Sequence, residues 1–238
     1  MTDPQAFQVE TAHAHLRAYR FTPPVPNGAP SVLLIHGARS RAEDLVGFAR
    51  QFADDGFETV TYSMGGYGES ERKGAFDDSD CRHAEDLEEF TRHLDTEFVL
   101  YGTSRGAGIG LMAAALGARA KGVISAGGAL DWNGIRETTG DEAMKAWLGG
   151  LSTDHLRRNS AANYADRIRI PVRLELGEME DPEVRRQNHQ FANDLRSLGV
   201  PVDTVEISRA GHAYFDKRFP QAWESRTVWI KRLASSSP

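Results

Sequence analysis

The sequence predicts an α/β protein with a mostly parallel central sheet of about eight strands and helices on both faces of that sheet. Short apolar runs, typical of strands buried on both faces, alternate with helical patterns of apolar residues along most of the chain. A Gly-x-Ser-x-Gly motif at residues 102–106 follows one apolar run and precedes a helical pattern. We therefore expect a strand, a tight turn and a helix around Ser104.

The composition suits one globular domain over residues 1–238, with 40% hydrophobic and 26% charged residues. The net charge is −6 and no cluster of Lys or Arg stands out, so neither nucleic acid nor a membrane surface is an expected partner. The N-terminal residues lack a basic stretch followed by an apolar core, which favours a cytoplasmic location. Cys81 is the one cysteine, which excludes an intrachain disulfide and a multi-cysteine metal site.

The expected elements begin with two short antiparallel strands at a sheet edge, because residues 7–20 alternate approximately between apolar and polar. Later apolar runs predict buried strands, and apolar residues at helical spacing predict the helices between them. The expected buried strands span residues 31–37, 57–62, 98–101, 121–126, 170–177 and 200–208. The expected helices lie at residues 45–52, 84–94, 107–116 and 182–199, and after Pro220.

Residues 131–169 interrupt this rhythm after the sixth expected strand. Trp132, Met144, Trp147 and Leu148 are scattered there among polar residues. We expect the segment to form a small cap or lid, whose four large apolar side chains line or cover a substrate pocket.

Ser104 is the expected nucleophile, because Gly102 and Gly106 let backbone approach a strained serine where a Cβ would obstruct it. The carboxyl ends of parallel strands meet at one rim of the sheet, so distant loops can meet Ser104 there. One of these loops carries an acidic cluster after residue 177, and another carries His212. The chain order serine, acid, histidine is the one expected of this architecture among serine hydrolases.

On these motifs the chain resembles the α/β-hydrolase superfamily over nearly its whole length. Residues 164–177, followed by Asp181-Pro-Glu-Val and by Gly211-His-Ala-Tyr-Phe, are similar to the prolyl-oligopeptidase and dienelactone-hydrolase branch. The resemblance implies a catalytic triad of Ser104, Asp181 and His212.

The acid of this triad has alternatives. Asp181 is favoured because the Pro-Glu-Val after it matches the continuation seen in the resembling family. Glu180 lies three residues after Gly177, which is the spacing that the superfamily often shows, and Asp131 follows the neighbouring strand. Glu180 and Asp131 therefore stay as alternatives.

The expected oxyanion donors are the backbone N–H groups of Ala38 and Arg105, the latter at a helix N-terminus. The segment from His36 to Arg39 lacks the glycine run of one lipase and esterase group, and His36 is expected to brace this loop. The side chains of Arg39 and Arg105 either attract an acidic acyl group, or they point into solvent or pair with Asp and Glu; the second alternative, solvent or pairing, is favoured.

These features together predict a cofactor-free serine hydrolase that cleaves small soluble carboxylic esters through an acyl-enzyme on Ser104. An exopeptidase or thioesterase with the same triad is the second hypothesis. A binding or regulatory protein that keeps the fold without turnover is the third. Either a monomer or a homodimer is compatible with the sequence.

Overall fold

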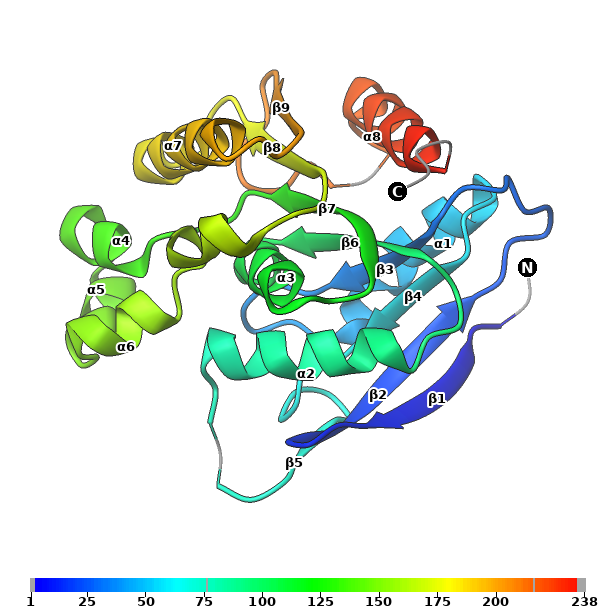
Figure 1. The fold of residues 1–238 in the computed structure, drawn as a ribbon, viewed down its shortest axis with the longest axis horizontal. Coiled ribbons are helices and arrows are strands. Elements are labelled where there is room, and N and C mark those ends of the chain that lie inside the picture. Colours follow the sequence, from blue (N-terminus) through cyan, green and yellow to red (C-terminus); the bar gives the residue numbers. More distant parts are fainter. Residues whose placement is uncertain (1–2, 76, 216, 235–238) are drawn as a thin grey trace.

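A nine-stranded sheet organises the computed structural model, which describes residues 3–75, 77–215 and 217–234. The strand order is β1-β2-β4-β3-β6-β7-β8-β9 (Figure 1). The short strand β5 lies outside this order and pairs with β2. All pairs from β4 to β9 along this order are parallel, whereas β2 runs antiparallel to β1, β4 and β5. The strands are β1 (Gln5–Glu10), β2 (Ala14–Phe21), β3 (Ser31–Ile35), β4 (Thr59–Tyr62), β5 (Glu71–Arg72), β6 (Phe98–Thr103), β7 (Ala120–Ala126), β8 (Val172–Gly177) and β9 (Val202–Ile207).

The α/β fold with a mostly parallel sheet is thereby confirmed, including the antiparallel edge formed by β1 and β2. β5 adds a strand that the sequence did not predict, because two residues are too short to show a period.

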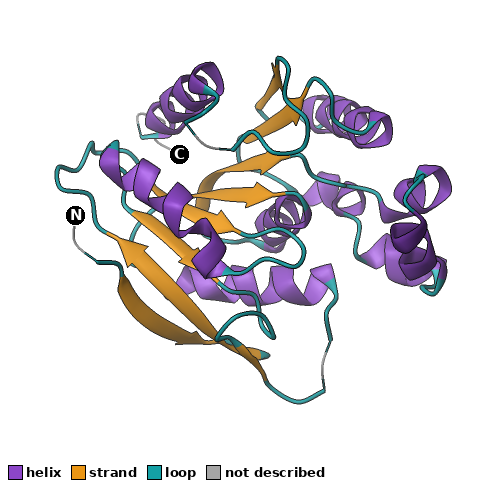
Figure 2. Cartoon of the chain, turned by 180° about the vertical axis from the view of Figure 1, so that it is seen from behind, coloured by secondary structure: helices purple, strands orange, loops and turns teal. Residues whose placement is uncertain are grey.

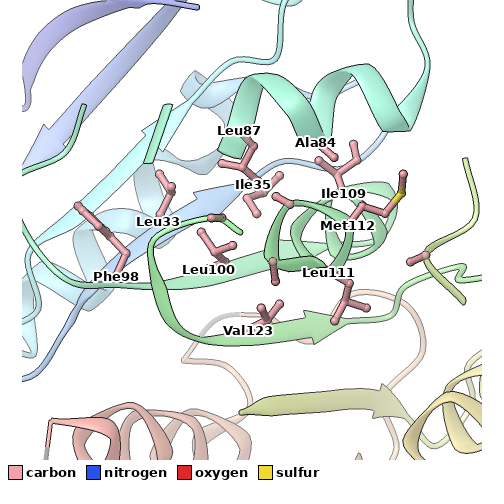
Figure 3. Packing of buried hydrophobic residues seen from close by; sticks show 14 of the residues in the cluster. Leu33, Ile35, Ala84, Leu87, Phe98, Leu100, Ile109, Leu111, Met112 and Val123 are labelled. Atoms are coloured by element: carbon pink, nitrogen blue, oxygen red, sulfur yellow. The ribbon is translucent and has the colours of Figure 1, made fainter. Parts of the chain in front are cut away.

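Helices cover both faces of the sheet, as expected. Apolar residues of α1 (Val46–Asp54) and α8 (Pro220–Leu233) belong to the core on one face. Those of α2 (Asp80–Arg92), α3 (Arg105–Leu116) and α7 (Pro182–Ser197) belong to the core on the other face. Figure 3 shows Leu87 of α2 and Ile109 of α3 packed over Ile35 of β3. This packing fixes α3, and with it the turn that leads from β6 into α3.

The segment between β7 and β8 forms three short helices and a 3-10 helix. They are α4 (Trp132–Thr138), α5 (Glu142–Gly149), α6 (Thr153–Arg158) and a 3-10 helix at Ala161–Arg167. In both ribbon views α4, α5 and α6 lie beyond the carboxyl ends of the parallel strands (Figures 1 and 2). The segment therefore stands at the rim where the sequence predicts a cap, and its action as a lid stays a prediction.

A buried ionic cluster lies under α8. Glu175 of β8 accepts hydrogen bonds from Arg226 Nη2 at 2.6 Å and from Arg173 Nε at 2.7 Å, and all three residues are at most 1% exposed. The same cluster holds the loop after β9, because Arg226 Nη1 donates to the Phe215 carbonyl at 2.7 Å. Tyr214 also donates its hydroxyl to the Glu175 carbonyl at 2.6 Å. No helix among the described residues is long and apolar enough to cross a membrane.

Candidate active site

Ser104 occupies a strained turn between β6 and α3. Its φ is 53° and its ψ is −122°, a combination that residues with a Cβ rarely adopt. The flanking glycines are required by sterics, because a Cβ on Gly102 would overlap the Gly106 carbonyl and a Cβ on Gly106 would overlap the His36 carbonyl. The turn is also anchored to β7 by the Ser104 N–H, which donates to the Ala126 carbonyl at 2.8 Å.

His212 and Glu180 form a hydrogen-bonded pair at the same rim. His212 Nδ1 lies 2.8 Å from Glu180 Oε2. The Glu180 side chain is 5% exposed, whereas the His212 side chain is 51% exposed and open to a reaction partner. The hydrogen bond to Glu180 raises the pKa of His212, although burial opposes this effect.

Asp181 does not contact His212 and instead caps α7. Its Oδ1 accepts hydrogen bonds from the backbone N–H groups of Glu183 at 2.8 Å and Val184 at 3.3 Å, and Pro182 occupies the first turn. The preference for Asp181 as the partner of His212 is therefore wrong in this structure. The Asp-Pro pair is a helix-start signal, and recognising it would have favoured the alternative Glu180. Asp131 likewise caps α4 by accepting from the Asn133 N–H at 3.0 Å.

Gly127, the residue after β7, shows how Ser104 and His212 come together. A Cβ on Gly127 would lie 3.1 Å from Glu180 Oε2 and 3.2 Å from His212 Cε1, while the preceding residue accepts the Ser104 N–H. The three predicted loops therefore meet around the end of β7. No hydrogen bond joins the Ser104 hydroxyl to His212 within the ranges that the structure describes.

The loop after β3 lies against Ser104 and is braced by His36. A Cβ on Gly37 would lie 3.2 Å from the Ser104 Cβ. His36 Nε2 accepts from the Met64 N–H at 3.0 Å, so Nδ1 carries the proton that it shares with the Gly37 carbonyl at 2.8 Å. Burial lowers the pKa of His36 to about 4, which keeps this brace neutral. The expected bracing role of His36 thus has a direct structural basis.

The two predicted N–H donors lie on this loop and on α3. Ala38 is exposed, and none of the described residues accepts a hydrogen bond from its N–H. Arg105 is the first residue of α3, so its N–H belongs to the turn whose N–H groups lack partners within the helix. Their positions are compatible with an oxyanion site between the loop and the helix.

The side chains of Arg39 and Arg105, the two arginines beside these donors, differ in their exposure to solvent. Arg39 is exposed, with a φ of 59°. The Arg105 side chain is 7% exposed and pairs with Asp78 and Asp80, with N–O distances of 3.1 and 2.6 Å. The favoured alternative, solvent exposure or pairing with acidic side chains, therefore agrees with the exposed Arg39 and with the paired Arg105.

The four predicted pocket residues belong to one aromatic and aliphatic cluster of the segment at residues 132–156. Trp132 and Trp147 pack edge to face with ring centroids 5.7 Å apart, and Met144 is partly buried beside the cluster. Trp147 is 50% exposed, so it can present its ring to a substrate. Leu148 has no exposed surface, which makes the prediction that it lines a pocket wrong. It fills the core between the short helices instead.

In residues 3–75, 77–215 and 217–234, no group of three or more His, Cys, Asp or Glu side chains is arranged to hold a metal ion. Cys81 is partly buried near the start of α2, where its Sγ lies 3.4 Å from the Ser79 hydroxyl.

Solved structures of other proteins resemble this chain over nearly its whole length. No curated protein matches its sequence. In structure, the chain is similar to Est1E from Butyrivibrio proteoclasticus, with a TM-score of 0.73 and 17% identity over 97% of this chain and 99% of the other. It is also similar to a thermostable carboxyl esterase from Bacillus coagulans, with a TM-score of 0.74 and 15% identity over 98% and 100% of the two chains.

A third similar structure is the acylaminoacyl peptidase of Pyrococcus horikoshii, with a TM-score of 0.73 and 18% identity over 96% of this chain and 42% of that one. At these identities the likeness shows the fold. Residues 30–154, which are more than half of the chain, match the alpha/beta hydrolase fold family. The chain therefore belongs to the alpha/beta hydrolase fold family and has the architecture of a hydrolase.

Proposed function

We propose that this protein is a serine hydrolase that cleaves small carboxylic esters through an acyl-enzyme on Ser104. The observation that carries the proposal is the Glu180–His212 pair, with its 2.8 Å hydrogen bond, at the rim that also holds the strained Ser104 turn. A buried carboxylate on one ring nitrogen of an exposed histidine is the arrangement that general-base catalysis by that histidine needs.

In the first half-reaction the Ser104 hydroxyl attacks the ester carbonyl. His212 Nε2 takes the hydroxyl proton and returns it to the leaving alcohol, which departs as the C–O bond breaks. His212 Nδ1 keeps its proton in the hydrogen bond to Glu180, whose negative charge stabilises the imidazolium that forms. Because Glu180 raises the pKa of His212, the imidazole is a stronger base in the pair than it would be alone.

The negative charge on the carbonyl oxygen would be stabilised by the N–H groups of Ala38 and Arg105. A donor of this kind typically contributes about 3 kcal/mol of transition-state stabilisation. Water then attacks the acyl-enzyme with His212 again as the base, which releases the carboxylic acid and restores Ser104. The reaction needs no group beyond these residues and water.

Esters are favoured over peptides as the substrate class. The comparisons with the two esterases span nearly the whole of both chains, whereas the comparison with the peptidase spans 42% of that protein. The half-exposed Trp147 offers an apolar ring for a small acyl or alkyl group at the rim of the sheet.

The proposal is tested by hydrolysis of p-nitrophenyl acetate together with labelling by a fluorophosphonate probe. The wild-type enzyme should turn over the ester and take up one probe on Ser104, whereas Ser104→Ala should do neither. Ser125→Ala is the matched control, because Ser125 is a buried serine of β7 whose hydroxyl makes no hydrogen bond. Hydrolysis at the wild-type rate by Ser104→Ala would refute the proposal.

A further inference from the structure

A buried polar cluster connects the nucleophile turn with the short helices at the rim, and the ester-cleavage mechanism above does not use it. Its centre is the carboxylate of Asp80, the first residue of α2. Asp80 Oδ1 accepts from Arg105 Nε at 2.6 Å, and Oδ2 accepts from the Trp132 indole N–H at 2.9 Å. The Asp80 and Arg105 side chains are each 7% exposed. One carboxylate therefore holds the first residue of α3 and the first residue of α4.

The Arg105 guanidinium is held on its other side as well. Nη1 donates to the Tyr67 hydroxyl at 2.9 Å and to Asp78 Oδ1 at 3.1 Å. Nη2 donates to the Asp78 carbonyl at 2.5 Å. A planar guanidinium bound along several edges has one orientation, so the side chain of Arg105 fixes the position of its own backbone.

Trp132 links Asp80 to the short helices at the rim, because it is the first residue of α4 and donates its indole N–H to Asp80. Its ring packs edge to face on Trp147, the exposed member of the cluster, with centroids 5.7 Å apart. Its backbone N–H donates to Ser160 Oγ at 2.9 Å, which ties the start of α4 to the segment before the 3-10 helix. The hydrogen bond from Trp132 to Asp80 thus orients the Trp132–Trp147 pair at the rim.

We propose that Asp80 is a positioning residue that places the Arg105 N–H for the oxyanion and the Trp132–Trp147 pair for the acyl group at the same time. This inference rests on the proposed ester hydrolysis and adds to it a residue that touches neither substrate nor nucleophile. It predicts that a single substitution of Asp80 lowers kcat for every ester and raises KM for bulky acyl groups.

Asp80→Asn is the direct test. Asparagine has the same shape, but its one carbonyl oxygen can accept from either Arg105 or Trp132, while its NH₂ group faces the other donor. At least one of the two hydrogen bonds is therefore lost. We expect kcat for p-nitrophenyl acetate to fall about tenfold or more, since small displacements of an oxyanion donor are costly.

Asp86→Asn is the matched control. Asp86 is also a buried aspartate of α2, and it pairs with Arg72 at 2.7 Å and accepts from the Thr11 hydroxyl at 2.7 Å. It contacts neither Arg105 nor Trp132. Both variants should lose stability, because Asp80→Asn removes one of the two carboxylate partners of the buried Arg105 and Asp86→Asn removes the carboxylate partner of the buried Arg72. Only Asp80→Asn should lower kcat, and equal kcat values for the two variants would overturn the proposal.

A second variant covers the case in which Asp80→Asn does not fold. Trp132→Phe removes the indole N–H and keeps an aromatic ring in the cluster. KM for p-nitrophenyl benzoate should rise about threefold or more. An unchanged KM for the benzoate ester would overturn the proposal. An inert wild-type enzyme would overturn the proposed function itself, which separates the two failures.

Discussion

Replacement of Glu180 by Gln tests which acidic residue orients His212. The change keeps the size of the side chain and removes its charge. Glu180 is almost fully buried and accepts the His212 hydrogen bond at 2.8 Å, a charge-assisted contact worth about 1.5–3 kcal/mol. Its loss corresponds to a fall in kcat/KM of about tenfold to about 150-fold.

The fall can reach about 10⁴-fold if the new amide donates to His212 Nδ1, because the imidazole then carries its proton on the nitrogen that must act as the base. Hydrolysis of p-nitrophenyl acetate measures both kcat and KM. Asp181→Asn is the control, because asparagine caps a helix as well as aspartate does, so activity should stay within about twofold.

The pH profile gives an independent signature. Glu180 raises the pKa of His212, so activity of the wild type falls as the pH falls through that raised value. Glu180→Gln removes the carboxylate that raises the pKa of His212, so the acidic limb of the kcat/KM profile should move to lower pH. Loss of activity in Asp181→Asn with full activity in Glu180→Gln would refute this assignment of the acid.

Two further predictions concern stability. Burial lowers the pKa of His36 and His83 to about 4, so the unfolded chain binds more protons below its own histidine pKa of about 6.5. The free energy of unfolding should therefore fall from pH 6.5 toward pH 4, by up to about 1.4 kcal/mol per pH unit for each histidine. Urea denaturation should show a smaller pH slope for His83→Gln, and an unchanged slope would contradict the reasoning. Glu175→Gln leaves the buried Arg226 without its charge partner and should cost about 3–5 kcal/mol. Glu97→Gln, which breaks an exposed ion pair, should cost at most about 1 kcal/mol in the same urea assay, and equal losses would contradict the prediction.

The periodicity of apolar residues was sufficient to predict the fold. Strand runs such as Ser31–Ile35 and Phe98–Thr103 are fully buried, and a strand buried on both faces gives an unbroken apolar run. The steric demand of the turn around Ser104 is equally local, so the motif at residues 102–106 correctly predicted a strand, a tight turn and a helix around Ser104.

The carboxylate that pairs with His212 was harder to predict, because two adjacent carboxylates have different contacts. Asp181 satisfies N–H groups of α7, which is a local helix-capping role, while Glu180 reaches a histidine 32 residues later. The Pro-Glu-Val after Asp181, which resembles the family, forms the first turn of α7. The sequence around Asp181 thus carries a local helix-capping signal, whereas the contact between Glu180 and His212 depends on the fold. This is why the sequence favoured Asp181 over Glu180.

The partners of the buried charges escaped prediction for a related reason. Arg105 follows Ser104 within a run of small residues, and its partners Asp78 and Asp80 precede it by more than 20 positions. Glu175 lies inside an apolar strand and pairs with Arg226, which is 51 residues away. A single sequence shows that such charges exist, but the fold decides which of them meet.

The most direct measurement of the central claim is the mass of the protein after rapid acid quenching of its reaction with p-nitrophenyl acetate. We expect a fraction of the wild-type chains to gain one acetyl group, located on Ser104 by peptide mapping. His212→Gln should form this adduct far more slowly. An acetyl group on another residue, or an equal rate of acetylation in His212→Gln, would contradict acyl transfer to Ser104 by a His212 base.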